Sequence, residues 1–415
     1  MIKIKPFKAL RPKKDLYSKV IAPPYDVVSH EDCMNLVKGN PYSLIHISRS
    51  EVDLPSNVDH YSSEVYLKAK ENLEKFIRDG FLVYDDKEYF YIYRLIMGTQ
   101  KQIGFVAGVN AYDYIDGIVK KHENTRQDKE DDRIRHIDIT NTQLEPVFLA
   151  YRSKESLDKI LFDIEKTTPE IDLTTDDGVK HTLWIVKDRN IHDKILSEFK
   201  NIPALYVADG HHRTAAACSI SKKRDADNKS GTEKEYQYFL SVIFPDNMLK
   251  IMDYNRVIKD LNSNSLESFI SKVEKNFMIE KTKSNDGKYG YKPTAKNHFG
   301  MYLNGEWYLL KAKEHIKSND PVKTLDVSIL QEYILSPILG IENPRTDKRI
   351  DFIGGIKGTD ILKELVDKKE FAVSFSMYPT SMAELFAVAD ANKLMPPKST
   401  WFEPKLKSGM VIHTL

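Results

Sequence analysis

The hydrophobic positions between residues 61 and 79 recur every three or four residues, and Gly80 follows them. This spacing is typical of an amphipathic helix, and a glycine just past the last apolar residue suits a left-handed C-cap. Three stretches rich in β-branched and aromatic residues come next, at 81–84, 89–96 and 103–110. Polar residues separate them, so the pattern predicts three strands in an antiparallel meander.

Beyond residue 145, apolar runs of strand type and helix type alternate irregularly. Helices are expected at residues 157–164, 191–199, 212–221, 266–276, 327–335, 361–368 and 382–390. Strands are expected at residues 147–151, 182–186, 205–208, 238–244 and 372–377. A hairpin is predicted at residues 298–311, because Asn304-Gly305 is a dipeptide that favours the type I′ turn. The predicted class is α+β, with mixed and antiparallel sheets and flanking helices.

Three polar stretches interrupt this pattern, at residues 120–141, 222–235 and 281–297. The second and third predict solvated loops, and the third is a candidate junction between lobes. The chain has 415 residues, and single hydrophobic cores stop growing at about 250–300 residues. We therefore expect an N-terminal α+β lobe, a catalytic core and a C-terminal α+β lobe, covering residues 1–115, 116–280 and 281–415.

Opposite charges are nearly balanced, with 62 Lys and Arg residues against 61 Asp and Glu residues. Such a chain has no overall positive field to hold a nucleic acid. The two cysteines, Cys33 and Cys218, form neither a disulfide framework nor a zinc-ligand spacing. The sequence shows neither a signal peptide nor an apolar run of membrane length. We expect a cytoplasmic protein, a monomer or small homo-oligomer, whose partners are small molecules rather than nucleic acid or membranes.

The run Asp209-Gly210-His211-His212-Arg213 follows an apolar strand and precedes small helix-forming residues. The turn should open a helix, whose first N–H groups and positive dipole end favour an anion. Gly210 allows close backbone approach, and the three residues after it add donors for a phosphate. Asp209 is a candidate Mg²⁺ ligand. The structural alternative is a capped helix with surface histidines.

A zinc site is not expected at this run. Adjacent histidines on a helix point about 100° apart, and the sequence places neither another His nor a Cys at ligand spacing.

Charges of both signs alternate densely from residue 120 to residue 133. Such runs are usually solvated surfaces. Here the cationic side chains could neutralise a phosphate, and the candidates are Lys121, His122, Arg126 and Lys129. Glu123 could remove a hydroxyl proton as a general base, a role that contributes about 10²- to 10⁴-fold in rate.

Two proline-rich segments present polar side chains from stiff backbone. In residues 22–29, Tyr25 and Asp26 follow two prolines that restrict φ. In residues 394–405, the candidates for substrate contact are Lys398, Ser399 and Thr400. Each segment is either a substrate loop or a rigid structural turn. The sequence holds no glycine-rich phosphate loop of the common nucleotide-binding type.

Taken together, residues 22–29, 121–133, 208–213 and 395–405 resemble a large prokaryotic and anaerobic-protist family long catalogued only as a domain of unknown function. Members of that family include pyrophosphate-dependent free serine kinases. The resemblance spans nearly the whole chain. The D-G-H-H-R core also resembles the ADP- and ATP-dependent free serine kinases of the ParB/sulfiredoxin-like superfamily, which implies a core of that fold.

The resemblance implies phosphoryl transfer from pyrophosphate to free L-serine, giving O-phospho-L-serine and phosphate, with Mg²⁺ as cofactor. The family's phosphate site at a helix start corresponds to residues 209–213. Catalytic roles are expected for Glu123, Asp209, His211 and His212, with Glu123 preferred as the base and Asp26 second. Three alternatives stay open: ATP or ADP as the donor, a phosphoserine phosphatase, and a ParB-like DNA-binding or regulatory protein.

Overall fold

The computed structural model describes residues 1–228 and 231–415. The chain forms two compact units. Unit 1 comprises Met1–Leu249 together with Pro404–Leu415, and unit 2 comprises Lys250–Glu403.

These boundaries differ from those expected after residues 115 and 280. β5 (Gln100–Asn110) pairs with β12 (Tyr238–Pro245), so one sheet continues across the first expected boundary. β15 (Phe277–Thr282) pairs with β17 (Glu306–Ala312), so a second sheet continues across the other. Strand pairing between distant parts of the chain leaves no mark on local composition, which is why the polar loops suggested the wrong junctions.

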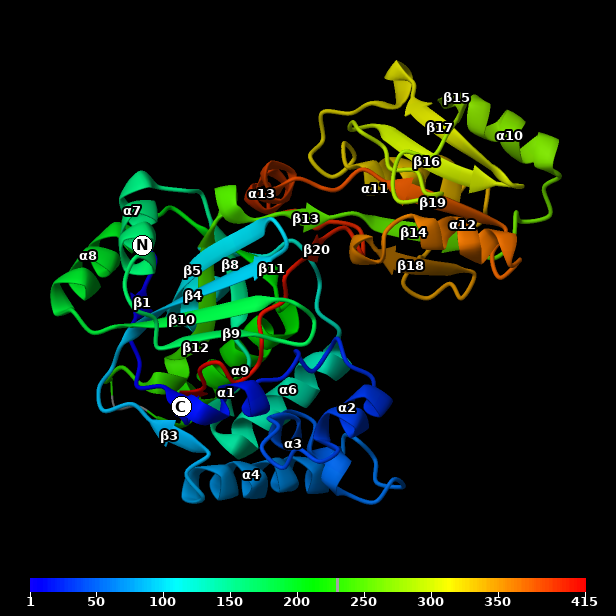
Figure 1. Cartoon of the computed structure of the whole chain (residues 1–415). Coiled ribbons are helices and arrows are strands. Elements are labelled where there is room, and N and C mark those ends of the chain that lie inside the picture. Colours follow the sequence, from blue (N-terminus) through cyan, green and yellow to red (C-terminus); the bar gives the residue numbers. More distant parts are fainter. Residues whose placement is uncertain (229–230) are drawn as a thin grey trace. The chain divides into compact units, whose positions relative to one another are not determined.

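Unit 1 is built around a mixed sheet of nine strands (Figure 1). Its order is β6-β11-β8-β12-β5-β4-β10-β9, and β1 pairs with β5. The strands other than β5 and β12 are β1 (Ile4–Lys5), β4 (Phe90–Met97), β6 (Val119–Lys120), β8 (Val147–Tyr151), β9 (Ile171–Thr174), β10 (Lys180–Val186) and β11 (Leu205–Asp209). The pairs β6–β11 and β8–β12 are parallel, whereas the other neighbours are antiparallel.

Helices and short strands complete unit 1. The helices are α1 (Tyr17–Val20), α2 (His30–Val37), α3 (Ile45–Ser48), α4 (Ser63–Arg78), α5 (Ala111–Ile115), α6 (Gln127–Thr140), α7 (Glu155–Glu165), α8 (Arg189–Phe199) and α9 (His211–Asp227). The short 3-10 turns lie at Lys14–Leu16, Ser50–Asp53, Glu235–Gln237 and Asp246–Met248. Two small sheets pair β2 (Leu10–Pro12) with β3 (Leu82–Tyr84) and β7 (Thr142–Gln143) with β21 (His413–Thr414).

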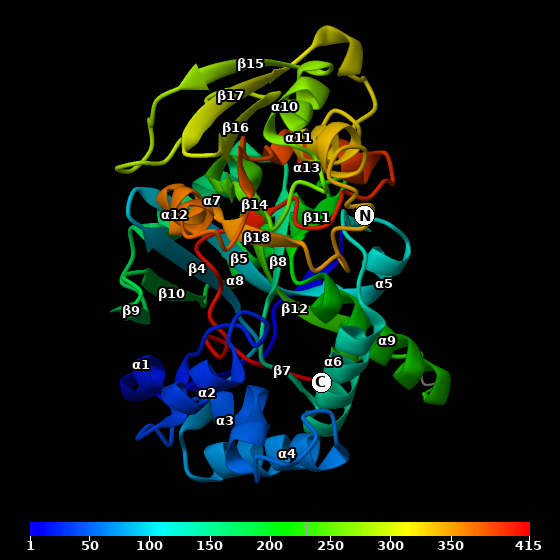
Figure 2. The same ribbon diagram turned by 90° about the vertical axis from the view of Figure 1, so that its right-hand side faces the viewer.

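The core of unit 1 explains how α9 is held. A buried cluster joins the sheet to α7, α8 and α9, with Leu161, Phe199 and Cys218 among its members. On its other side, α9 packs against α6 through Ala216, Ile220 and Ile137, and the two helices lie side by side (Figure 2). The start of α9 is therefore fixed between the sheet and α6.

Several local predictions for unit 1 are confirmed, and others are wrong. The helix expected at 61–79 is α4, and Gly80 follows it with a φ of +72°. The three-strand meander is wrong, because β3 pairs with β2 rather than with β4. The loop expected at 222–235 starts late, because α9 continues to Asp227, and residues 229–230 lie outside the described residues. The polar stretch 120–141 contains α6, whose buried face is largely polar and so gave no hydrophobic period.

Unit 2 contains a six-stranded antiparallel sheet in the order β15-β17-β16-β19-β14-β18. Its further strands are β13 (Ile251–Met252), β14 (Tyr254–Ile258), β16 (His298–Leu303), β18 (Ile350–Gly354), β19 (Val373–Met377) and β20 (Trp401–Phe402). Its helices are α10 (Leu266–Glu274), α11 (Asp326–Leu330), α12 (Asp360–Asp367) and α13 (Met382–Asp390), with a π-helical turn at Gln331–Leu335 and 3-10 turns at Glu314–Ile316 and Gly355–Lys357. The predicted hairpin is confirmed, because β16 and β17 flank Asn304 and Gly305, both with positive φ. The α+β class is likewise confirmed in both units.

The segment Pro404–Leu415 ties distant parts of unit 1 together. β21 pairs with β7, Leu10 forms a bridge with Ile412, and Ala22 forms a bridge with Ser408. This segment therefore lies against the proline-rich loop at residues 22–29.

Within the described part of the chain, none of the helices combines the length and the apolar character that crossing a lipid bilayer requires.

Unit 1 buries histidines in a way that predicts acid sensitivity. Burial lowers the pKa of His122, His136 and His181 to about 4 in each case. Because an unfolded histidine has a pKa of about 6.5, the unfolded chain takes up protons first as the pH falls. The stability from these groups is complete above pH 6.5 and declines towards pH 4, by about 1.4 kcal/mol per pH unit for each histidine.

Urea unfolding at pH 7.5, 6.0 and 5.0 measures this effect. We expect the urea concentration at the unfolding midpoint to fall with each decrease in pH. In His136→Gln this midpoint should depend less on pH. His60→Gln is the control, because the His60 side chain is 44% exposed. Equal midpoints at pH 7.5 and 5.0 would contradict the expectation.

Candidate functional site

The site forms where two parallel strands end together. β6 pairs with β11 in parallel register, Val119 with Leu205 and Lys120 with Tyr206. Because parallel strands leave a sheet at the same edge, the residues after β6 come next to those after β11. Ligand atoms of His122, Glu123 and His211 accordingly all lie within 4.8 Å of one another. The structure thus brings these three residues of the two charged runs together, while their shared role in one site stays a prediction.

Gly210 opens α9 in a conformation that other residues rarely adopt. Its φ is +93°, in the left-handed region. A Cβ at this position would also lie 3.1 Å from the guanidinium of Arg213. The turn therefore requires glycine both for its backbone and for its close approach to Arg213, and it leaves the first N–H groups of α9 at the site.

Asp209 ends β11 between two cations. Its Oδ2 lies 3.2 Å from Nη2 of Arg213 and 3.7 Å from Nζ of Lys405. Burial alone would raise the pKa of Asp209, but the charges of Lys405 and Arg213 outweigh it and lower this pKa to about 2. The carboxylate is therefore ionised at neutral pH. Lys405 is the last residue of the proline-rich segment 394–405, but the sequence pattern did not predict it as a site residue.

The Arg213 guanidinium is buried and already hydrogen-bonded, so it does not expose both terminal nitrogens to solvent. The residue is 7% exposed, and its two terminal nitrogens donate to the Pro146 carbonyl and to Asp209. Its Nε has no hydrogen-bond partner among the described residues. Arg213 thus braces the turn and supplies positive potential, while its direct contact with phosphate stays a prediction.

His212 connects the two charged runs. Its Nε2 accepts a hydrogen bond of 3.0 Å from the backbone N–H of Arg126, the residue that precedes α6. Burial lowers the pKa of His212, which favours the neutral form that can accept this bond. His212 therefore fixes the start of α6 against the start of α9.

The exposed cations of the second run have other partners. The Arg126 guanidinium pairs with Asp128 at 2.9 Å, and Lys129 donates to the Tyr61 hydroxyl at 2.8 Å. Lys121 is exposed, and its charge acts on His211. Within the 209–213 run, the charge of Lys121 acts on His211 and the charge of Arg126 acts on His212. The phosphate-binding roles of Lys121, Arg126 and Lys129 stay predictions.

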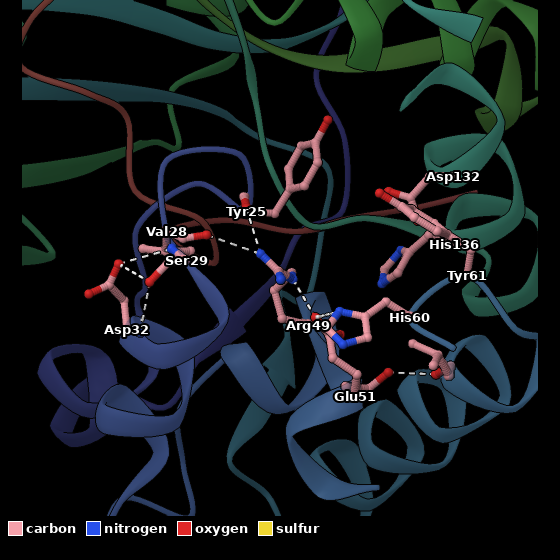
Figure 3. Close-up of polar contacts among 12 residues, drawn as sticks. Tyr25, Val28, Ser29, Asp32, Arg49, Glu51, His60, Tyr61, Asp132 and His136 are labelled. Carbon is pink, nitrogen blue, oxygen red and sulfur yellow. Dashed lines mark hydrogen bonds and ion pairs between the residues drawn. The ribbon is translucent and has the colours of Figure 1, made fainter. Parts of the chain in front are cut away.

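The proline-rich loop at residues 22–29 is anchored by Arg49 (Figure 3). Nη1 of Arg49 donates to the carbonyls of Tyr25 and Val28 at 3.0 and 3.2 Å, and its Nε pairs with Glu51 at 2.6 Å. The loop is thereby held in one conformation. The charge of the exposed Asp26 acts on both His212 and Arg213, so the loop borders the site as the sequence suggested.

Two buried groups behind this loop were not predicted. The Arg133 guanidinium lies 3.9 Å from the centre of the Tyr25 ring, and Glu145 accepts a hydrogen bond from the Tyr25 N–H. Burial raises the pKa of Glu145, although the charges of Arg213 and Arg133 oppose the shift. A cavity of about 30 Å³ is lined by these three charged residues together with uncharged neighbours. Their separation in sequence gave no local signal.

The remaining predicted substrate residues belong to unit 2. Lys398 has a φ of +59°, and its ammonium lies 5.5 Å from the centre of the Tyr254 ring. The Ser399 hydroxyl donates to the Pro396 carbonyl within its own turn. Contact of Lys398, Ser399 and Thr400 with substrate stays a prediction.

Asp209 is also the residue expected to hold Mg²⁺. Its side chain is ionised and 32% exposed, and both nearby cations approach the same oxygen, Oδ2. Magnesium is usually bound by one or two carboxylates together with phosphate oxygens. The donor set at the start of α9 therefore fits such an ion when a phosphate is present.

Comparisons with solved structures give weak likenesses. A free serine kinase in complex with AMP matches at 14% identity and a TM-score of 0.33, over 74% of this chain and 92% of that one. A conserved hypothetical protein from Pyrococcus furiosus matches at 14% identity and a TM-score of 0.33, over 74% and 95%. SbnI with a C-terminal truncation, from Staphylococcus aureus, matches at 10% identity and a TM-score of 0.38, over 74% and 87%. Scores this low leave the function to be argued from the site.

Among curated proteins there is no match to the sequence. A family model, described as a protein of unknown function (DUF1015), matches residues 4–328. Because this match covers well over half of the 415 residues, the chain belongs to the DUF1015 family.

Proposed function

We propose that this protein transfers a phosphoryl group from pyrophosphate to the hydroxyl of free L-serine, giving O-phospho-L-serine and phosphate. The observation that carries the proposal is the meeting of Glu123 with His122 and His211 at the start of α9, which directly follows Asp209 and Gly210. The identities of donor and acceptor rest on the family resemblance given by the sequence motifs.

The start of α9 provides the means to hold a phosphate. The helix spans 17 residues, so its first N–H groups and its positive dipole end face the turn. Arg213 and Lys405 add positive charge beside Asp209, and the charge of Lys121 acts on His211. Phosphoryl transfer needs mainly positioning and neutralisation of the charge on the transferred oxygens, which these groups would supply.

In the proposed reaction, the serine oxygen forms a bond to one phosphorus and the bridging P–O bond of pyrophosphate breaks. A carboxylate takes the serine hydroxyl proton, and the departing phosphate carries away the negative charge. Glu123 is the preferred base because it lies within the cluster with His122 and His211. Asp26 is second, because its charge reaches His212 and Arg213 from the anchored loop.

Mg²⁺ would be held by Asp209 together with phosphate oxygens, and it would neutralise charge on the donor. Of the predicted substrate residues, Tyr25 and Asp26 in unit 1 would contact the amino acid, while a role for Lys398, Ser399 and Thr400 of unit 2 stays a prediction.

The test is a set of reactions followed by ³¹P NMR. Full-length protein, L-serine and Mg²⁺ are mixed with pyrophosphate, ATP or ADP in separate tubes. We expect O-phosphoserine with pyrophosphate. If O-phosphoserine forms only with ATP or ADP, that nucleotide rather than pyrophosphate is the donor. The absence of O-phosphoserine with all three would reject the proposal.

The reverse direction distinguishes a kinase from a phosphatase. O-phosphoserine is incubated with protein and Mg²⁺, with and without phosphate. A kinase requires phosphate and forms pyrophosphate, whereas a phosphatase releases serine without added phosphate. Salt-dependent binding of duplex DNA in place of either reaction would favour the DNA-binding alternative.

A further inference from the structure

The sequence placed His122, Glu123 and His211 in one phosphate site but did not predict them as a set of metal ligands. The first two residues follow β6 and the third begins α9, and their ligand atoms all lie within 4.8 Å of one another. The rings of His122 and His211 approach edge to face, with 4.5 Å between their centres. The parallel pairing of β6 with β11 therefore brings two further candidate ligands, His122 and Glu123, to His211.

His211 is buried with an unused nitrogen. The residue is 7% exposed, and its Nε2 has no hydrogen-bond partner among the described residues. A buried polar group left without a partner destabilises the folded state. A buried imidazole nitrogen beside another histidine and a carboxylate indicates a ligand for that nitrogen.

His122 is oriented by a second contact. It is 1% exposed, and its ring donates a hydrogen bond to the backbone carbonyl of Val207. Histidines that bind metals commonly donate their other ring N–H to a carbonyl or carboxylate, which fixes the tautomer and the ring. The Val207 carbonyl would serve as such a support.

The chemistry of this set differs from that expected for Mg²⁺. Two imidazoles and one carboxylate suit zinc, manganese, iron, cobalt or nickel, whereas Mg²⁺ prefers oxygen ligands. At present the three donor atoms are separated by up to 4.8 Å. Metal–ligand bonds of about 2.0–2.2 Å require these atoms to move closer to one another when the ion binds. Three protein ligands also leave a coordination position open, as in catalytic rather than structural sites.

We propose that His122, Glu123 and His211 bind a divalent transition-metal ion beside the start of α9. Metal binding itself does not depend on the proposed function. The role of the metal does, because its open coordination position would face the proposed phosphate site. If Glu123 is bound to the metal during the reaction, Asp26, the second candidate, would be the base, and the kinetics of Glu123→Gln and Asp26→Asn distinguish the two roles. This proposal reverses the expectation from sequence that zinc-type binding is absent.

A second group of possible ligands must be separated from the first. His30, Glu51 and His60 also have ligand atoms within 4.8 Å of one another. Both histidines are exposed, and Glu51 already pairs with Arg49 at 2.6 Å (Figure 3). We expect this group to bind metals weakly, and His60→Ala removes it.

The experiment titrates full-length protein, stripped with EDTA and desalted, with Co²⁺ in the absence of substrates. Visible absorption bands of bound Co²⁺ and equilibrium dialysis give the affinity and the stoichiometry. We expect one tightly bound ion per chain, displaced by Zn²⁺. His211→Ala and Glu123→Gln should each weaken binding by about 10-fold or more.

The matched control is His212→Ala, one residue along the same helix. Its Nε2 already accepts the Arg126 N–H, so its loss should change Co²⁺ affinity less than threefold. Wild-type protein without Co²⁺ binding overturns the proposal. Binding that survives both His211→Ala and Glu123→Gln, or that is lost in His60→Ala, overturns it as well.

Folding of each variant is checked by circular dichroism, and Glu123→Gln decides the outcome if His211→Ala does not fold. Because no substrate is present, the result is independent of the kinase assay. Metal binding without phosphoserine formation supports the metal site and rejects the proposed reaction. Phosphoserine formation without metal binding supports the reaction and rejects the metal site.

Discussion

Asp209→Asn should lower kcat for serine phosphorylation by about 10²- to 10³-fold, as the loss of one preorganised electrostatic contact does in other enzymes. The change keeps the shape of the side chain and removes its charge. That charge holds Lys405 and Arg213 at the turn and, in the proposed mechanism, the Mg²⁺. Initial rates with pyrophosphate at saturating L-serine measure the effect.

Asp172→Asn is the matched control for this substitution. Asp172 also lies in the sheet of unit 1 and pairs with Lys180 at 3.0 Å, but it belongs to β9 at the opposite end of the strand order from β6. We expect near-normal kcat in the control. Since Asp209→Asn removes the carboxylate that pairs with the buried Arg213, its melting temperature should fall, and rates are compared well below it. Near-normal turnover of folded Asp209→Asn would remove Asp209 from the mechanism.

Glu123→Gln should lower kcat by about 10²- to 10⁴-fold, the contribution of a positioned general base. The amide is similar in size to the carboxylate and cannot accept the serine proton. Donor binding should change little, so the loss should appear in kcat more than in the KM for pyrophosphate. Steady-state kinetics with both substrates varied provide the measurement.

Glu130→Gln tests whether any carboxylate of the same charged run has this effect. Glu130 lies in α6, and its two oxygens accept hydrogen bonds from Thr125 and Ser219. We expect a rate close to that of the wild type. If Asp26→Asn abolishes turnover while Glu123→Gln retains it, the two base assignments must be exchanged. If both variants are slow and Glu123→Gln also loses Co²⁺, Glu123 acts as a metal ligand.

Local sequence pattern was sufficient for the elements around residues 209–213. The strand before Asp209, the glycine turn and the helix after it were all predicted, because each is encoded within a few residues. The same holds for α4, whose apolar face repeats at helical spacing, and for the hairpin around Asn304-Gly305. These elements need no information from distant parts of the chain.

The pairing of strands was not predictable in the same way. β6 has only two residues, too few for a period, yet its parallel contact with β11 brings His122 and Glu123 to His211. The helix α6 was missed because it buries polar groups, including Asp132 and His136, where a hydrophobic stripe is normally expected. Glu145, Arg133 and Lys405 reach the site through tertiary contacts that leave no motif. The sequence could therefore predict the glycine turn at residues 209–213 but not the strand pairing that brings His122 and Glu123 to His211.

The return of Pro404–Leu415 to unit 1 has a consequence for biosynthesis. A ribosome makes the nine-stranded sheet and then all of Lys250–Glu403 before it reaches Lys405, the partner of Asp209. β7 also waits for β21, which is translated later still. A polypeptide that ends within unit 2 would thus lack Lys405 and β21. A stop codon anywhere in Lys250–Glu403 should therefore yield protein without the proposed serine phosphorylation, even where the nine-stranded sheet has already formed.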